Sequence, residues 1–259
     1  MSEFAAGQCM FPFHALAVIG HGIEQIMRID DQGVLALDTN SDAIFYVSAT
    51  NQTPEALVCA KEGCCKDSLR CHKSSSLGIS KIAVLSNTKN IVYFSDRSTI
   101  KKFQIGESFI YPKVLVDFQN FVPDFGSINS FAISKSYLRI FVLANSVVYR
   151  YNIDSKQISG EIVLKNEEFV QNIVSLTENI LLGKSGEAGT TPIVINFDND
   201  SATRICNSKE IRFAKNTNVL RNVTNCRNLF EIEEMVYDGS YIYIMDSDKR
   251  IRVINSVEG

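Results

Sequence analysis

The sequence predicts an all-β protein, a single β-propeller of about five to six four-stranded blades. Three observations predict this fold. Short apolar runs recur along the 259 residues and are separated by polar turns. Five of these runs open similar strand–turn–strand segments at a roughly regular period. No apolar stretch with helical spacing over about ten residues competes convincingly with the strands.

The five segments each contain an apolar strand, a polar turn and a second strand. In chain order they are "AIFYVSATNQTPEALV", "NIVYFSDRSTIKKFQI", "RIFVLANSVVYRYNID", "NILLGKSGEAGTTPIVINF" and "YIYIMDSDKRIRVINS". Each follows another short strand, which for the first segment is "GVLALDTNSD". Alignment gives spacings of 47, 49, 40 and 62 residues between the anchors Ile44, Ile91, Ile140, Ile180 and Ile242. A period of about 40–50 residues is the usual size of a propeller blade.

Further runs are expected to complete the blades. The stretches between segments, "YPKVLVDF", "ISGEIVL" and "ATRICNSKEIRFA", each supply a fourth strand. The strongest helical competitor is "GHGIEQIMRIDDQG", because Ile23, Ile26 and Met27 fit helical spacing. Its place before the first blade favours an outer strand instead. Strands from the two ends of the chain are expected to form a sixth blade and close the ring.

The domain organisation follows from this period. One propeller domain is expected over 1–259, with insertions at 59–76, which is rich in cysteine, and at 206–230. Residues 1–12 are expected to lie outside the fold, as a disordered tail or a cloning remnant, because "MSEF" resembles a cloning scar.

Composition restricts the partners. The net charge is −3 and the basic residues form no stripe, so nothing electrostatic indicates nucleic acid. No apolar run reaches the 18 or so residues that a membrane span needs, so we expect no membrane insertion. A protein is the expected partner, and oligomeric state is left open.

Two strand–turn–strand motifs resemble a known repeat. "IVYFSD" and "YIYIMDSDKRIRVI" are similar to the core of the YWTD and NHL propeller repeats, in which an aromatic-rich strand ends in Asp. Asp96 and Asp246 hold that position, whereas the tryptophan of YWTD is absent because the chain has no Trp. The resemblance implies a β-propeller whose repeat core is structural and whose function lies on loops and faces.

The cysteines are the most informative polar residues. A disulfide framework is favoured, and its candidates are Cys59, Cys64, Cys65, Cys71, Cys206 and Cys226. A zinc site would use Cys59, Cys64 or Cys65, Cys71 and His72, but the spacing is not that of a common zinc knuckle. Free thiols in a cytosolic protein are the third alternative. Cys9 has no obvious partner.

Three sequons support secretion weakly. They lie in expected turns and are candidate N-glycosylation sites, at Asn51, Asn199 and Asn222.

Catalytic signals are sparse. The chain lacks the common nucleophile, metalloprotease and phosphate-loop motifs, so no catalytic residue and no cofactor are expected. A Ca²⁺-dependent propeller hydrolase would need oxygen ligands, which could come from Asp38, Asn40, Asp42, Asp96, Asp246 and Asp248. Tight turns favour the same residue types, and this explanation is preferred. The strand residues Lys101, Lys102, Arg150, Arg250 and Arg252 are interpreted as a solvent-facing surface that discourages edge pairing, rather than a stripe read by a partner.

These observations favour a non-enzymatic propeller that binds another protein or acts in adhesion. An extracellular or secretory setting is preferred, because the cysteines cluster in loops. A cytoplasmic propeller scaffold of a trafficking or assembly complex is the first alternative, and the Ca²⁺-dependent hydrolase is the second.

Overall fold

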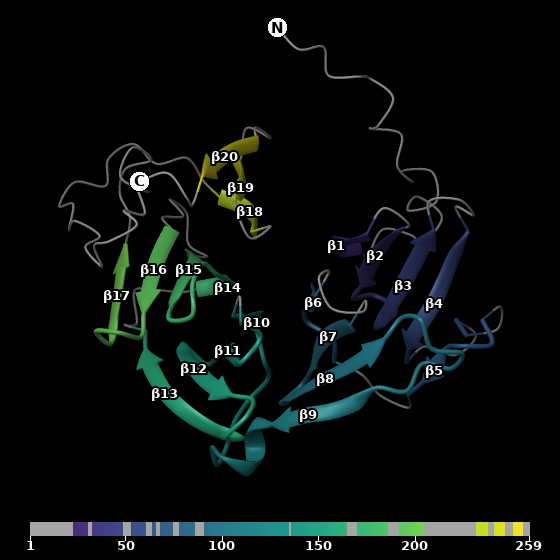
Figure 1. Ribbon diagram of the computed structural model, residues 1–259, viewed down its shortest axis with the longest axis horizontal. Coiled ribbons are helices and arrows are strands. Elements are labelled where there is room, and N and C mark those ends of the chain that lie inside the picture. The colour runs from purple at the N-terminus through teal and green to yellow at the C-terminus, as the bar shows by residue number, and fades with distance from the viewer. Residues whose placement is uncertain are drawn as a thin grey trace, which may run out of the picture. The chain divides into compact units, whose positions relative to one another are not determined.

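The computed structural model contains β-strands almost throughout. It describes residues 23–30, 33–48, 53–60, 64–65, 68–74, 78–85, 91–134, 136–164, 170–185, 192–204, 232–237, 241–246 and 251–255. Within these residues the only helix is one short 3-10 turn, η1 (Phe118–Asn120). The all-β prediction is therefore confirmed (Figure 1).

The first compact unit ends at Asp124 and holds two sheets. The first sheet has the order β1 (Ile23–Asp30), β2 (Gly33–Asp38), β3 (Ala43–Ser48), β4 (Pro54–Cys59) and β5 (His72–Lys73). The second sheet has the order β6 (Ile82–Leu85), β7 (Ile91–Asp96), β8 (Thr99–Gln104) and β9 (Lys113–Asp117). Every pairing is antiparallel except that of β4 with β5.

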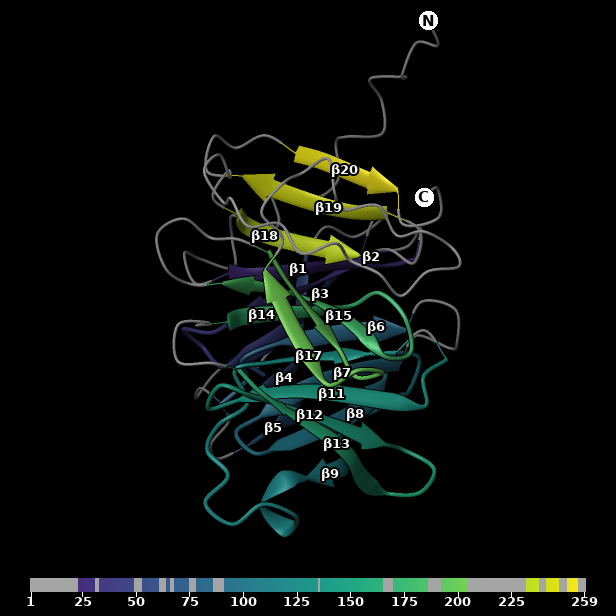
Figure 2. The same cartoon turned by 90° about the vertical axis from the view of Figure 1, so that its left-hand side faces the viewer.

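The second unit begins at Phe125 and holds three sheets. One contains β10 (Ser130–Ile133), β11 (Arg139–Ala144), β12 (Val147–Asn152) and β13 (Gln157–Val163). The next contains β14 (Val170–Ser175), β15 (Ile180–Ser185), β16 (Pro192–Asn196) and β17 (Ser201–Arg204). The last, clear in Figure 2, contains β18 (Ile232–Tyr237), β19 (Tyr241–Asp246) and β20 (Ile251–Asn255).

Neighbouring sheets contact each other through their first strands. In the first unit β1 packs against β6, and the Gln25 amide bonds both backbone groups of Ile82, its Nε2 donating to the oxygen and its Oε1 accepting from the nitrogen, each at 2.9 Å. In the second unit β10 packs against β14, where the Ser130 hydroxyl oxygen accepts a bond from the Ile173 nitrogen at 3.1 Å. The equivalence of these contacts makes β1 the first strand of its own sheet.

This equivalence corrects the predicted alignment of the first blade. The second strand there is β2, not the strand that contains Ile44, and β2 corresponds to β7, β11, β15 and β19. Residues 23–30 form a strand, as expected, but this strand opens the first sheet and does not precede the first blade. With the corrected alignment Asp38 joins Asp96 and Asp246 as the residue that ends a second strand.

The number of complete blades also differs from the prediction. Within the described residues four sheets have four or more strands, and β18–β20 form a three-stranded sheet. The expected count was five to six four-stranded blades. A closing blade built from both chain ends involves residues 1–22 and 256–259, which lie outside the described part of the chain.

The core lies between the faces of neighbouring sheets. One cluster combines apolar residues of the first and second sheets, and a second cluster does the same for β10–β13 and β14–β17. Every residue of β2 is buried, so the strand is covered on both faces. This explains why its apolar residues occupy successive positions and do not alternate with polar ones. In the first cluster Phe94 meets Phe103 edge to face, with 5.9 Å between ring centroids.

Two arginines and one asparagine join β11–β13 to the next sheet. Arg139 and Arg150 both donate to Oδ1 of Asn179, and Asn179 donates through Nδ2 to Asp198. The Arg150 guanidinium lies 5.0 Å from the ring centroid of Phe197. Burial and the charge of Arg139 lower the pKa of Arg150. Arg150 thus holds two sheets together, which corrects its interpretation as part of a simple solvent-facing surface.

We expect Asn179→Ala to destabilise the second unit by about 1–3 kcal/mol, because two partly buried guanidinium groups lose their shared acceptor. Thermal unfolding followed by circular dichroism measures the effect. Asn129→Ala is the control, since Asn129 is exposed and lies in the same unit. Equal melting temperatures for the two variants would contradict a clamping role.

Candidate functional site

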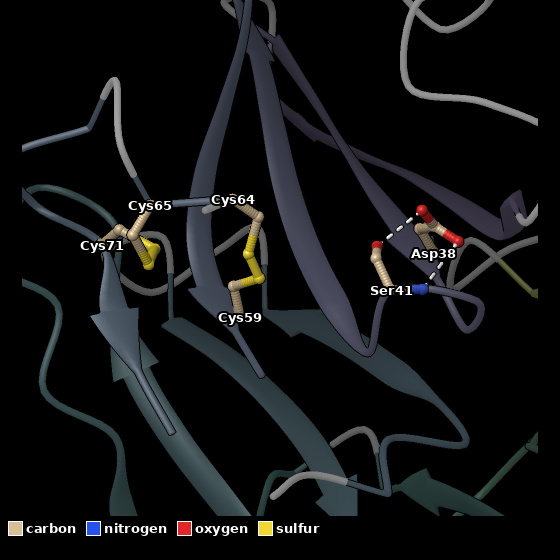
Figure 3. The surroundings of a disulfide bond; sticks show 6 residues. All are labelled: Asp38, Ser41, Cys59, Cys64, Cys65 and Cys71. Carbon is tan, nitrogen blue, oxygen red and sulfur yellow. Dashed lines mark hydrogen bonds between the residues drawn. A yellow bond between two sulfur atoms is a disulfide. The ribbon is translucent and has the colours of Figure 1, made fainter. Parts of the chain in front are cut away.

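The cysteine-rich insertion is attached to the outer edge of the first sheet. Cys59 is the last residue of β4, and Cys71 immediately precedes β5. Disulfide pairs link Cys59 to Cys64 and Cys65 to Cys71, with Cα–Cα distances of 6.4 and 5.4 Å (Figure 3). Both distances fall within the range of about 4.4–6.8 Å that disulfides require.

The zinc alternative needs the same sulfur atoms. Within the described residues no group of three or more His, Cys, Asp or Glu side chains is placed to hold a metal ion. Cys9, Cys206 and Cys226 lie outside the described residues, so the expected pair between the last two stays a prediction.

The insertion returns alongside the strand that it leaves. Residues of β5 pair in parallel with the end of β4, Val58 opposite His72 and Cys59 opposite Lys73. The backbone nitrogen of Ser74 donates to the Cys59 oxygen at 2.9 Å. The end of the β4 edge is therefore covered by the chain itself.

One glutamate anchors the insertion to the sheet. Arg70 forms an ion pair with Glu55 of β4, and its Nε donates to Glu55 Oε1 at 3.0 Å. The hydroxyl of Ser68 donates to the same oxygen at 3.0 Å. Arg70 also donates to the carbonyl of Ile105 at 3.2 Å, and its own carbonyl accepts a bond from the Ile110 nitrogen at 2.9 Å. The insertion thus contacts both the first sheet and the segment between β8 and β9.

We expect this anchor to weaken in acid. The bond from Arg70 lowers the pKa of Glu55 despite its partial burial. A lowered folded-state pKa gives stability that is present above the unfolded value of about 4.3 and is lost as the pH falls through the folded value. After correction for the intrinsic exchange rate, which itself falls with pH, the backbone amides of residues 68–74 should lose protection as the pH falls through the folded value, as hydrogen–deuterium exchange would measure.

Glu55→Gln tests the cause of that acid response. The variant should show low protection of the amides in 68–74 at neutral pH and little further loss of protection in acid. A pH response equal to that of the unsubstituted chain would rule out Glu55 as its origin.

His72 lies beside Tyr111, with ring centroids 6.1 Å apart in an edge-to-face arrangement. Burial and the positive charge of Lys101 lower the pKa of His72. Lys101 itself is paired with Asp96. The lowered pKa favours the neutral imidazole, and its ring packs edge to face on Tyr111. We therefore interpret His72 as a structural residue.

Exposed apolar side chains gather around this insertion. Eight large hydrophobic residues are exposed in the described part of the chain, and four of them lie in the insertion or in 109–114. These four form what we call the apolar rim: Leu69, Phe109, Tyr111 and Val114. The Arg70–Ile110 backbone bond brings their two segments together, and Val114 is the Cα partner of Lys101. The apolar rim could not be predicted from the sequence, because a single leucine among polar loop residues carries no periodic signal.

The acidic residues at strand ends stabilise turns. Asp38 accepts bonds from the Asn40 and Ser41 nitrogens and from the Ser41 hydroxyl (Figure 3). Asp96 accepts a bond from the Gly78 nitrogen at 3.1 Å and pairs with Lys101. These contacts agree with the preferred turn interpretation of the carboxylates.

Asp42 lies in the turn that follows Asp38. Burial raises the pKa of Asp42, which also lies in the field of Asp96 and Asp38. Asp246 ends β19 in the other unit, and Asp248 lies outside the described residues.

The remaining predicted residues are distributed as follows. Asn199 lies in an exposed turn, where its side-chain oxygen accepts a bond from Ser201, the hydroxyl residue of its own sequon. Asn51 and Asn222 lie outside the described residues, as does Arg250. Lys102 is the Cα partner of Lys113 at the edge of the second sheet.

Comparisons with known proteins establish the fold class. No family model matches the chain, and no curated protein matches it by sequence. The WD40 repeats of RRP9 superpose with a TM-score of 0.56 at 12% identity, over 92% of this chain and 62% of that one. A chain of the mitotic checkpoint complex superposes with a TM-score of 0.53 at 8% identity, over 91% of this chain and 64% of that one.

These likenesses confirm the β-propeller, since WD40 repeats form propeller blades. The chain spans less than two thirds of the length of these two structures. Among the described residues there is no helix with the length and apolar character of a membrane span. The chain is thus an all-β propeller, and its structural neighbours include the WD40 repeats of RRP9.

Proposed function

We propose that the chain is a non-enzymatic β-propeller that binds another protein, in an extracellular or secretory setting. The observation that carries this proposal is the disulfide-linked insertion at 59–74, which is anchored on Glu55 and presents the apolar rim. Exposed apolar side chains on neighbouring segments are a feature of many protein-binding sites.

The similarity to solved structures supports the scaffold part of this proposal. WD40-type propellers bind proteins through loops and faces while their blades supply the framework. The narrower kinship with YWTD and NHL repeats gains support from Asp38, a third aspartate at the end of a second strand beside Asp96 and Asp246. That kinship is part of the proposal.

The setting is tested by expressing the chain both through the secretory pathway of cultured cells and in the cytosol. Each product is alkylated without reductant and weighed, then weighed again after reduction. We expect the four cysteines of the insertion to alkylate only after reduction in the secreted product. Glycosidase treatment should also reduce its mass if Asn51, Asn199 or Asn222 carries a glycan.

The contrary outcome has a definite meaning. If the folded chain forms only in the cytosol and all seven cysteines alkylate without reduction, the extracellular setting is excluded. The cytoplasmic scaffold then becomes the favoured function. The Ca²⁺-dependent hydrolase has no specific observation in its favour among the described residues.

A further inference from the structure

We propose that the Leu69 side chain, on its anchored backbone, inserts into an apolar pocket of the partner protein. Carboxylates border this pocket. This inference rests on the proposed function and names the contact surface and the chemistry of the partner. Four properties carry it: the exposure of Leu69, the anchoring of its neighbours, the apolar residues beside it and the charge around it.

Leu69 is 98% exposed, although the residues on either side of it are held in place. Ser68 and Arg70 both bond to the carboxylate of Glu55, so the chain is attached on both sides of the leucine. The Cys71 nitrogen also donates to the Ser68 oxygen at 3.4 Å, and Cys71 is paired with Cys65. A side chain on an anchored backbone loses less conformational entropy on binding, which favours its use as a contact.

The neighbouring apolar residues extend the surface that a partner would cover. Phe109 is 50% exposed, Tyr111 60% and Val114 59%. A single exposed leucine is common and needs no explanation. An anchored leucine beside two half-exposed aromatic rings has the composition of a binding hot spot with a surrounding contact area.

The charges near the rim favour an acidic partner. Lys73 and Lys113 are exposed, and neither forms an ion pair with any described residue. The carboxylates of Glu55 and Asp96 are already paired with Arg70 and Lys101, so they do not neutralise these lysines. Glu107 is the one exposed carboxylate within 107–114. Carboxylates around the pocket of the partner would complement this surface and speed association.

The experiment places a photo-crosslinking residue in the full-length chain, as Leu69→p-benzoylphenylalanine. The matched control is Val163→p-benzoylphenylalanine, because Val163 is also exposed but lies on β13 in the other unit. Both chains are illuminated on cultured cells, together with an unsubstituted chain treated with a lysine-reactive crosslinker. The captured protein is identified, and its crosslinked peptide is mapped by mass spectrometry.

Support requires two results. Capture from position 69 must map to an apolar segment flanked by Asp or Glu, and it must be absent from position 163. Leu69→Asp must then lower the affinity of the purified partner by about tenfold or more, the size typical of a hot spot. Val163→Asp must leave that affinity unchanged. Circular dichroism should show both variants folded, since both positions are exposed.

The other outcomes overturn the role of Leu69, the partner chemistry, or the proposed function as well. If the lysine crosslinker or position 163 captures a partner whose affinity Leu69→Asp does not change, the proposed contact role of Leu69 is wrong and the proposed function stands. If no chain captures any protein, both are wrong. If position 69 captures a partner through a polar or basic segment, the proposed partner chemistry is wrong.

Discussion

Phe94→Ala is expected to lower the free energy of unfolding of the first unit by about 3–5 kcal/mol, the usual cost of truncating a buried phenylalanine. Phe94 is fully buried in the cluster shared by the first two sheets, and its ring packs against Phe103. The substitution removes apolar contacts on both sides and leaves a cavity that strands on either side cannot easily close. Among the described residues of this unit, no completely buried side chain is larger than that of Phe94.

The loss is measured by thermal and denaturant unfolding followed by far-ultraviolet circular dichroism, because the chain contains no tryptophan for fluorescence. Phe109→Ala is the matched control, since Phe109 is half exposed. It should change stability by less than about 1 kcal/mol. A Phe94→Ala chain as stable as the control would contradict the packing of the first sheet on the second.

Gly33→Ala is expected to destabilise the same unit by about 1–3 kcal/mol through overpacking. A Cβ atom at position 33 would lie 2.6 Å from the Val47 carbonyl oxygen and 2.5 Å from the ring of Tyr46. The first contact involves the backbone of a paired strand, so it cannot be relieved by rotating a side chain. Relief requires β2 to move away from β3, which breaks the pairing of Gly33 with Ser48.

Gly106→Ala is the internal control for this second prediction, because nothing lies within 4 Å of a Cβ at position 106. The two variants make the same chemical change and differ in the space available. Their melting temperatures are compared by circular dichroism. Equal values would mean that β2 and β3 have room to separate, contrary to their observed pairing.

The fold class could be predicted from the sequence because the blade period is written in local patterns. Apolar runs such as "IVYFSD" predict strands, and the polar turns between them predict where the strands end. The alignment of the first blade could not be derived in this way. The contact that identifies β1 as a first strand joins Gln25 to Ile82, which is 57 residues away.

The candidate site divides in the same way. Four cysteines within a short loop predict disulfides from the sequence alone. The anchoring of that loop depends on Glu55 and Arg70, which are 15 residues apart and belong to different elements. Leu69 lies between the two residues that bond to Glu55, and no property of the leucine itself could reveal its exposure.

The parallel addition of β5 to β4 has a consequence for the behaviour of the chain at high concentration. An open strand edge can template a strand from another molecule, and this is a common route to aggregation. Residues 72 and 73 of β5 occupy the end of the β4 edge. The disulfide pair Cys59–Cys64 limits how far the insertion that carries β5 can move from β4. The attached strand β5 thus blocks part of this edge from pairing with another molecule. Reductant in a storage buffer should therefore increase the rate of aggregation.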